Sequence, residues 1–367
     1  MMRIGIVGLP NAGKSSLFNA LTRAGAQTGN YPFTTIEQNI GVTPVPDERL
    51  HQVAAIAGSR AAYPTSIQFV DIAGLVRGAH RGEGLGNQFL AHIREMDALA
   101  HVVRCFEDSS VVHVEGGVDP VRDVETVELE LILADLATVE RRQEKVTRLR
   151  KTGQAEYQRE AELLAEVADH LNQGVPLRHQ GLTLTELELL QPLHLLTLKP
   201  TVYVANVSEA TFQELAPLYA ATQRTGPGDE LDLAARSADR HLASLAAYVQ
   251  GQGAPLVVVS ARWEAELAEL EAESRAEFLA DMGLEELGLE RMVRAGYRLL
   301  DLITFFTANE NETRAWTIKR GTTAPAAAGK VHSAMQQGFI CAEVISAAEL
   351  VRAGSFTAAR EQGLIRL

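Results

Sequence analysis

The sequence has few of the features that define several large classes of protein. It contains two cysteines, Cys105 and Cys341, which are too few for a disulfide framework and are not spaced like the ligands of a metal site. No stretch is apolar enough to span a bilayer. A strand is predicted from Arg3 onward, which leaves no room for a signal peptide. We therefore expect a cytoplasmic protein that does not bind membranes.

Positive charge is also in deficit. Lysine and arginine total 34 residues against 47 aspartates and glutamates, so the formal net charge is −13. This balance excludes general adhesion of the whole molecule to nucleic acid, and we expect no specific DNA partner, although a local basic patch remains compatible with it. A chain of 367 residues, 46% of them hydrophobic, is long and apolar enough for two or three domains.

The most informative pattern is near the N-terminus, where residues 8–15 read Gly-Leu-Pro-Asn-Ala-Gly-Lys-Ser. This G-x-x-x-x-G-K-S sequence follows a predicted buried strand at 3–7 and precedes a predicted helix at 16–21, the setting that a phosphate-binding loop requires. Glycines let the loop turn its N–H groups toward an anion, and the helix N-terminus adds further donors. Lys14 would reach the β- and γ-phosphates, and Ser15 would ligate Mg²⁺.

Two later segments have the residues of a magnesium–phosphate site. The polar stretch 30–37 contains Thr34 and Thr35, either of which could reach Mg²⁺. A predicted strand at 66–70 ends in Asp71, which could hold Mg²⁺ through water, and Gly74 follows, whose N–H could approach the γ-phosphate. The alternative for this second segment is a plain turn at the end of a strand.

Two residues bear on how water would be activated. Leu75 stands where many GTPases have a glutamine that orients the attacking water, so another group or a partner would have to position it. His113 lies on a loop after a predicted strand at 100–105 and could act as a base or position water. The alternative for His113 is a loop histidine without a chemical role.

A base-reading segment follows the predicted strand at 200–205. GTPases usually read guanine here with N-K-x-D, whose aspartate accepts two guanine N–H groups, whereas this chain has Asn206, Val207, Ser208 and Glu209. The longer glutamate would spoil the paired geometry and Val207 would offer an apolar contact to the base, which favours adenine. Ser260, after the last predicted strand, would contact the base through the backbone. The alternative for residues 206–209 is an ordinary helix cap.

Taken together, these motifs resemble those of the YchF-type, Obg-related P-loop NTPases, over nearly the whole chain. The segments that carry the resemblance are residues 8–15, 30–35, 71–79 and 206–209. The resemblance implies an ATPase of the translation-factor class that associates with ribosomes or ribosomal RNA, with a helical insertion and a C-terminal TGS domain. It selects Thr35 as the Mg²⁺ ligand, supports a catalytic His113, and implies K⁺ binding near Asn11. The nucleotide contacts it implies are Asn11, Ala12, Gly13, Lys14, Ser15, Ser16 and Val207.

A helical hairpin is predicted within the nucleotide-binding part. Between 121 and 150, apolar residues fall at Leu129, Ile132, Leu136, Val139 and Val146, with Gln143 at the missing place; between 157 and 171 they fall at Tyr157, Ala161, Leu164, Ala168 and Leu171. Such alternating steps of four and three predict two helices that pack along a seam. Basic residues gather near the turn, where they would either contact RNA phosphates or form a solvated face: Arg141, Arg142, Lys145, Arg148, Arg150 and Lys151.

The C-terminal part is similar to a TGS domain, a small β-grasp module. Its predicted elements are a helix at 284–301, strands at 302–307 and 314–318, a short helix at 329–339 and a strand at 340–346. Family members usually have charged residues where Ala334, Gln336 and Gln337 stand, and they continue into further β structure beyond the position of Leu367. We therefore expect an incomplete module with an exposed sheet edge.

The predicted fold class is α/β: a P-loop G-domain with a parallel sheet at 1–122 and 198–282, an inserted α-helical hairpin at 123–197, and a C-terminal β-grasp (TGS) domain at 283–367. The expected activity is Mg²⁺-dependent hydrolysis of ATP, with Lys14, Thr35, Gly74 and His113 in catalytic roles, and Ser15, Thr35 and Asp71 on the metal. Asn206, Glu209 and Ser260 complete the base site. The alternatives are an Obg-type GTPase and a nucleotide-gated ribosome- or RNA-binding switch whose hydrolysis is incidental.

Overall fold

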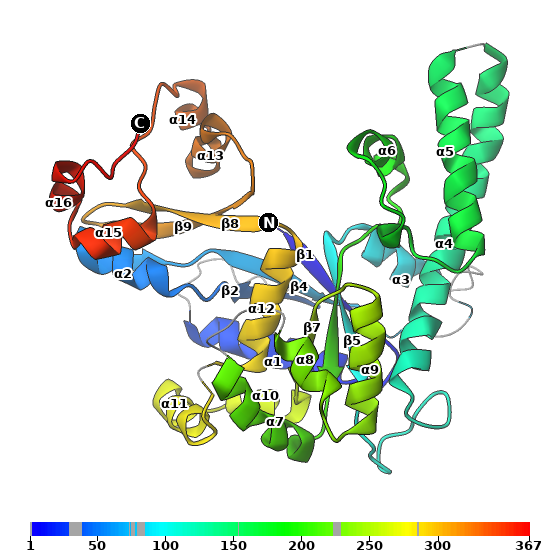
Figure 1. Cartoon of the computed structure of the whole chain (residues 1–367), viewed down its shortest axis with the longest axis horizontal. Coiled ribbons are helices and arrows are strands. Elements are labelled where there is room, and N and C mark those ends of the chain that lie inside the picture. The colour runs from blue at the N-terminus through cyan, green and yellow to red at the C-terminus, as the bar shows by residue number, and fades with distance from the viewer. Residues whose placement is uncertain are drawn as a thin grey trace.

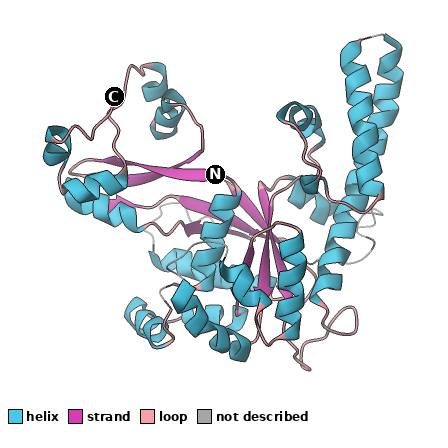
Figure 2. Cartoon of the chain, viewed as in Figure 1, coloured by secondary structure: helices cyan, strands magenta, loops and turns pink. Residues whose placement is uncertain are grey.

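The structure is a computed structural model that describes residues 2–28, 39–72, 74, 78, 85–152, 154–222, 229–284 and 286–367. Thr34, Thr35 and Leu75 lie outside the described residues. A mostly parallel sheet forms the centre, with helices on both faces, a long helical hairpin to one side and a smaller module to the other (Figures 1 and 2). None of the described helices is both long enough and apolar enough to cross a membrane.

The central sheet has six strands in the order β2-β4-β1-β5-β6-β7. All pairings are parallel except that of β2 with β4. Parallel strands end at the same edge of a sheet, and the crevice outside these ends is where α/β folds bind ligands. The strands are β1 (Arg3–Val7), β2 (Ile40–Pro44), β4 (Ser66–Asp71), β5 (Ala98–Arg104), β6 (Thr201–Asn206) and β7 (Leu256–Val259).

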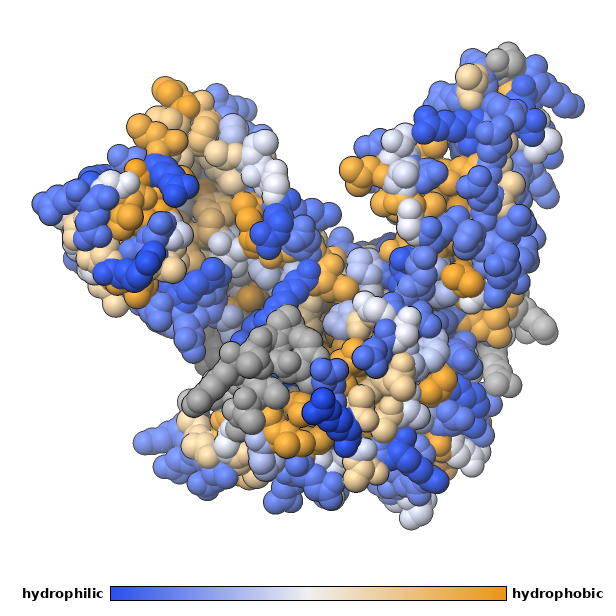
Figure 3. All heavy atoms as spheres, in the orientation of Figure 1, coloured by the Kyte–Doolittle hydropathy of each residue, from blue (hydrophilic) through white to orange (hydrophobic). Residues whose placement is uncertain are grey.

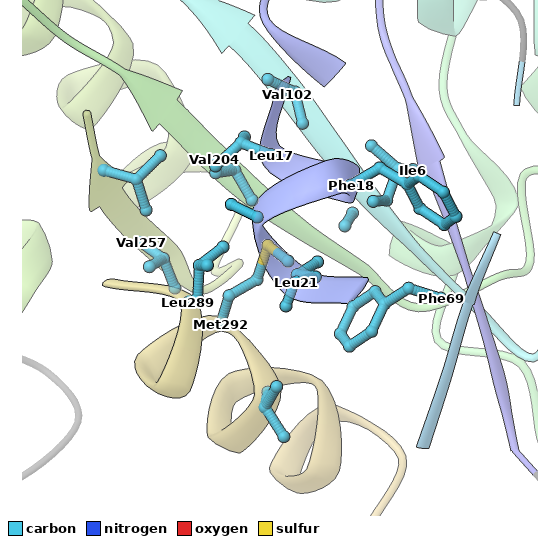
Figure 4. Close-up of a cluster of buried hydrophobic side chains, with 14 of the residues drawn as sticks. Ile6, Leu17, Phe18, Leu21, Phe69, Val102, Val204, Val257, Leu289 and Met292 are labelled. Atoms are coloured by element: carbon cyan, nitrogen blue, oxygen red, sulfur yellow. The ribbon is translucent and has the colours of Figure 1, made fainter. Parts of the chain in front are cut away.

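Successive residues of the central strands face two separate cores. Val202 and Val204 of β6 join one hydrophobic cluster, whereas Tyr203 and Ala205 join another. The first cluster lies beneath α1 (Lys14–Thr28) and α12 (Gly288–Leu299), where Leu21 and Met292 lie beside one another (Figure 4). Burial of both faces explains why these strands are nearly continuous in apolar residues. The other helices around the sheet are α3 (Leu85–Arg94), α7 (Glu209–Thr222), α8 (Asp229–Ala235), α9 (Arg240–Gly251), α10 (Ala261–Leu267) and α11 (Ala272–Asp281).

The hairpin consists of α4 (Pro120–Leu149) and α5 (Ala155–Asn172), and α6 (Leu184–Leu190) lies on the way back to the sheet. Figure 1 shows that α4 begins beside the sheet and continues past it to the tip of the hairpin. The predicted seam is present, with Ile132, Val139 and Val146 of α4 in one cluster with Leu164 and Leu171 of α5.

Two details of the hairpin bear on its predicted seam. Gln143 occupies the polar seam position and donates a hydrogen bond from Nε2 to the carbonyl of Leu164 at 3.1 Å. The assignment of Leu129 to the seam is wrong, because this side chain is 51% exposed. At this height α4 packs against the sheet, and Val127 and Leu131 face the core instead.

The C-terminal module is built on a three-stranded sheet in the order β3-β9-β8. β8 (Leu302–Ala308) and β9 (Glu312–Lys319) form an antiparallel hairpin, and β3 (Ala61–Tyr63) pairs with β9 in parallel. The module thus shares a sheet with a segment from the first fifth of the chain. Its helices are α13 (Ala324–Val331), α14 (Ser333–Gln337), α15 (Ala347–Ala353) and α16 (Phe356–Glu361).

A second contact joins the module to the N-terminal part. Val53 of α2 (Glu48–Ala57) is buried in one cluster with Leu350 of α15 and Ala359 of α16. The predicted strand at 340–346 is wrong, since only an isolated bridge between Val344 and Arg366 occurs there. Without a neighbouring strand over its length, this segment has no partner for a ladder of hydrogen bonds.

A buried carboxylate joins α10 to α12. Glu264 is 3% exposed, and its Oε1 accepts a hydrogen bond from the backbone N–H of Gly288 at 2.8 Å. Its Oε2 is buried without a hydrogen-bond partner among the described residues. Burial raises the pKa of Glu264 from 4.5 to about 7, against the opposing charge of Arg291. Ionisation of this group at neutral pH therefore opposes folding.

We expect this group to make the protein less stable as pH rises from about 4.5 to about 7. The unfolded chain loses the proton near pH 4.5 and the folded chain only near 7, so the loss approaches about 3 kcal/mol above pH 7. Urea denaturation at pH 5 and pH 8 should show that Glu264→Gln is less sensitive to pH than the wild type. Glu266→Gln, on the exposed side of the same helix, is the control. A difference between Glu264→Gln and wild type that does not vary with pH would contradict this expectation.

Candidate functional site

The loop between β1 and α1 depends on two glycines at close approaches. Gly8 and Gly13 have φ values of +146° and +96°, a region that favours glycine. A Cβ at Gly8 would lie 2.3 Å from the carbonyl oxygen of Val102, and one at Gly13 would lie 2.2 Å from Nδ2 of Asn206. The loop is therefore seated directly on β5 and β6, at the edge where the parallel strands end.

Lys14 lies inside this loop with little solvent access. Lys14 is 6% exposed, and its Nζ donates a hydrogen bond to the carbonyl of Leu9 at 2.8 Å. Burial lowers its pKa from 10.5 to about 8, while the nearby Asp71 carboxylate opposes the shift. An anion bound in the loop would compensate this buried charge and raise the pKa again.

Gly74 lies beside this lysine. A Cβ built on Gly74 would be 3.2 Å from Lys14 Nζ and 3.1 Å from the backbone nitrogen of Pro10. The structure thus brings the predicted glycine of the second segment against the phosphate loop, although the two are 60 residues apart in sequence. Its backbone is close enough to face a ligand held by that loop.

Ser15 and Asp71 form the candidate magnesium site. Ser15 Oγ donates to Asp71 Oδ2 at 2.9 Å, and Asp71 Oδ1 is buried without a hydrogen-bond partner among the described residues. No group of three or more His, Cys, Asp or Glu side chains that could hold a metal occurs in the part of the chain that is described. Mg²⁺ at nucleotide sites usually keeps several waters and takes one or two protein groups beside the phosphates, so this small donor set suits it.

Asn206 joins three parts of the site. Its Nδ2 donates to the carbonyl of Ala12 at 3.0 Å, and its Oδ1 accepts from the N–H of Ala261 at 2.9 Å. Because the residue is 3% exposed, this side chain ties β6 to the phosphate loop and to the start of α10. Asn206 therefore braces the phosphate loop. The sequence predicted only a contact with the base for this residue.

The other predicted base contacts differ in exposure. Val207 is 2% exposed and packs in the core, so its side chain does not line an open surface as expected for a contact with a base. The N–H of Val207 is also engaged, by the carbonyl of Val259 at 2.9 Å. Ser260 is equally buried at 2%. Glu209, the first residue of α7, is partly exposed, and its Oε1 lies 3.4 Å from Nε of Arg262.

His113 lies near the phosphate loop but both of its ring nitrogens are engaged. Nδ1 accepts a hydrogen bond from the N–H of Glu115 at 3.1 Å, which places the proton on Nε2, and Nε2 lies 2.8 Å from Oδ2 of Asp123 in the first turn of α4. One residue earlier, the carbonyl of Val112 accepts from Nδ2 of Asn11 at 3.0 Å. The loop is therefore next to the site, but its histidine has no free lone pair in this arrangement.

Arg104 holds this loop in place, a role that was not predicted from the sequence. It is 3% exposed, and its guanidinium donates to the carbonyls of Phe106, Asp108 and Val111 at 3.0–3.1 Å. Its charge also lies 4.7 Å from the centre of the Phe106 ring. The only signal in the sequence is an arginine at the end of a strongly apolar strand.

Of the remaining predicted contacts, Ala12 is buried at 3%, whereas Asn11 and Ser16 are exposed at the mouth of the loop. The side chains that the structure brings together at this edge are thus those of Asn11, Lys14, Ser15, Asp71 and Asn206, with the backbone of Gly74. Thr35 stays a prediction, since it is outside the described residues.

Comparison with known proteins identifies the family. A family model described as 50S ribosome-binding GTPase matches residues 3–123, and the YchF GTPase carboxyl-terminal family, described as a protein of unknown function, matches residues 302–367. The chain is 45% identical over 363 residues to the ribosome-binding ATPase YchF of Bacillus subtilis, covering 99% of this chain and 93% of that protein. The chain belongs to the YchF family.

Further YchF relatives agree with this assignment. The ribosome-binding ATPase YchF of Escherichia coli O157:H7 is 45% identical over 364 residues, covering 99% of this chain and 94% of the relative. The solved structure of the Schizosaccharomyces pombe YchF GTPase superimposes with a TM-score of 0.83 at 32% identity, over 100% of this chain and 93% of that one. The predicted fold class and family are thereby confirmed.

Proposed function

We propose that this chain binds Mg²⁺–ATP, hydrolyses it to ADP and phosphate, and associates with ribosomes in the cytoplasm. The observation that carries the proposal is the assembled phosphate site. A buried Lys14 lies within the glycine loop, and a Ser15–Asp71 pair with one unpartnered oxygen lies beside it. The relatives named ribosome-binding ATPase support both the reaction and the partner.

The proposed roles follow from charge and position. Lys14 and the loop amides hold the phosphates and stabilise the charge that develops on the transferred group. Ser15 and Asp71 hold Mg²⁺, with Thr35 as the proposed further ligand, and the metal when bound neutralises phosphate charge. The N–H of Gly74 approaches the γ-phosphate. For His113 to activate water, it first has to leave Asp123, since its ring nitrogens are otherwise occupied. K⁺ near Asn11 is proposed as a second cation.

Selection of adenine is part of the proposal. The acceptor that reads two guanine N–H groups in GTPases is replaced by Glu209, which is longer by one methylene. Adenine has no N–H at those positions, so it loses nothing by the change. The competing proposal is an Obg-type GTPase; the family matched over residues 3–123 is described as a GTPase, but the relatives matched over the whole chain are named ATPases, so this alternative is not favoured. The third possibility is a nucleotide-gated ribosome-binding switch with incidental hydrolysis.

The tip of the hairpin is the proposed contact with ribosomal RNA. Lys145, Arg148, Arg150 and Lys151 are exposed, and no ion pair holds them among the described residues. Arg142, in contrast, forms two hydrogen bonds to Glu160 at 2.6 and 3.0 Å and is less available. Free cationic side chains at the end of a long, projecting hairpin can reach phosphates despite a net charge of −13.

The proposed domain organisation keeps the boundaries set out above. We propose that 1–122 and 198–282 form the G-domain, that 123–197 form the inserted hairpin, and that 283–367 form a TGS-type module, of which α12 packs in the core of the central sheet. The pairing of β3 with β9 means that the module and the G-domain share backbone hydrogen bonds across the last boundary. Figure 3 shows an open notch between the C-terminal module and the hairpin, so the surfaces of these two parts do not meet on the viewed face.

The direct test is hydrolysis of ATP and GTP side by side, with and without ribosomes and K⁺. We expect faster turnover of ATP and co-sedimentation with ribosomes. A double charge reversal, Arg148→Glu with Lys151→Glu, should weaken ribosome binding by about tenfold through lost phosphate contacts. A single charge reversal on the G-domain surface, Arg23→Glu, is the control. Binding of GTP tenfold tighter than ATP would overturn the choice of nucleotide.

A further inference from the structure

An ion pair joins the start of α7, next to Asn206, to the start of α10. Glu209 lies three residues after Asn206, and Arg262 follows Ala261, whose N–H donates to Asn206 Oδ1 at 2.9 Å. Beyond this bridge the two side chains meet, with Glu209 Oε1 3.4 Å from Arg262 Nε. Arg262 also lies 3.5 Å from Glu266 on the next turn of α10. The two segments are thus joined at their base by a buried hydrogen bond and at their surface by an ion pair.

The loop after β5 has a carboxylate, that of Asp108, which interacts electrostatically with Arg262. The pKa of Asp108 is held low, first by hydrogen bonds from Ser110 and in smaller part by the charges of Arg104 and Arg262. Arg262 is the second residue of α10, which begins directly after β7, so it stands at the edge where the parallel strands end. The side chains of the pair remain solvent-accessible, at 74% for Arg262 and 38% for Glu209, so a ligand can reach them.

The chemistry of this pair bears on which purine fits. Guanine presents N–H donors at ring position 1 and at its exocyclic amine, and both need an acceptor. A guanidinium has only donors, so it cannot supply one. Glu209 is too long for the paired geometry of the aspartate, but its oxygens can still accept from guanine, and Arg262 Nε, 3.4 Å from Oε1, competes for them. Adenine presents no donor at those positions, so it is not affected.

We propose that Arg262 is a specificity residue that disfavours GTP by occupying the carboxylate of Glu209. This inference rests on the proposed function, because it assumes that the base lies between residues 206–209 and 260–262. It adds a residue outside the base-reading segment itself, on α10. Because the pair is exposed, its contribution to selectivity is a modest factor rather than an absolute block.

The test is a comparison of Mg²⁺–ATP and Mg²⁺–GTP affinities by isothermal titration calorimetry. In the wild type we expect ATP to bind more tightly, and in Arg262→Ala we expect the ratio of GTP to ATP dissociation constants to fall by roughly three- to fivefold through tighter GTP binding. Arg262→Lys, which keeps the charge, should retain part of the selectivity. Arg23→Ala, an exposed arginine paired with Glu269 elsewhere on the G-domain, should leave the ratio unchanged.

A double-mutant cycle shows whether Arg262 acts through Glu209. In a Glu209→Gln background the carboxylate is gone, so Arg262→Ala should have no further effect on the ratio. An unchanged ratio in Arg262→Ala, or an equal effect of this substitution in both backgrounds, overturns the inference while leaving the proposed ATPase intact. A wild type that binds neither nucleotide, or that prefers GTP, overturns the proposed function and this inference together.

Discussion

Lys14→Met is expected to lower the rate of ATP hydrolysis by about two to three orders of magnitude. The ammonium group is a buried cation at the point where the loop would hold the transferring phosphoryl group, and loss of one such preorganised group commonly has an effect of this size. Methionine keeps the apolar stem and fills a similar space, so the change removes the charge with little loss of packing. Single-turnover hydrolysis with saturating Mg²⁺–ATP is the measurement.

The same substitution has a second expected effect, on stability. Burial lowers the pKa of Lys14 to about 8, so below that pH the folded protein holds a charge that is more favourable in the unfolded chain. Lys14→Met should therefore raise the free energy of unfolding without nucleotide by about 1–3 kcal/mol near pH 7, and the gain should shrink as pH rises above 8.

A matched control separates these two effects. Lys199 is a partly buried lysine outside the site, where its Nζ donates to the carbonyls of Arg94 and Met96. Lys199→Met, which also removes a buried ammonium group, should leave the hydrolysis rate per folded molecule unchanged. If Lys14→Met hydrolysed ATP at the wild-type rate, the assignment of the phosphate site would be wrong.

Asp71→Asn is expected to raise the Mg²⁺ concentration needed for half-maximal hydrolysis by about 10–100-fold. The carboxylate accepts a hydrogen bond from Ser15 Oγ and has one buried oxygen free, so it can orient both a protein ligand and a water of the metal. Groups that orient metal ligands typically change metal affinity or activity by this factor. An amide removes the negative charge and offers a donor where an acceptor is needed.

The measurement is a titration of the hydrolysis rate with Mg²⁺ at fixed ATP. Asp97→Asn is the control, because Asp97 accepts from the N–H of Arg3 at the opposite end of the strands. Its Mg²⁺ requirement should match that of the wild type. An Asp71→Asn protein with an unaltered Mg²⁺ requirement would exclude this carboxylate from the metal site.

The predictions from sequence held where a local pattern decides the structure. The glycines of residues 8–13 set the loop, and the strand before it and the helix after it follow directly. The seam at Ile132, Val139 and Val146 is periodic, so it was visible in the sequence. Each parallel strand was recognised as an apolar run, and the residue at the end of each run lies at the site because parallel strands finish together.

The predictions failed where partners are distant in sequence. The segment 340–346 has the composition of a strand but no neighbouring strand over its length, so it forms only one bridge. Leu129 fits the seam pattern, but at its height α4 faces the sheet rather than α5. The pairing of β3 with β9 joins residues about 250 positions apart, and no local signal identifies it.

The sequence by itself determined that this chain has a phosphate loop, a likeness to YchF proteins and a two-helix insertion, because each is written in residues close together along the chain. Only the tertiary structure decided that Asn206 braces the phosphate loop, that Val207 is buried, that His113 is bound to Asp123, and that Arg262 meets Glu209. These contacts depend on the directions of side chains from separate strands and helices. Those directions are set by packing of the whole sheet, which no single segment contains.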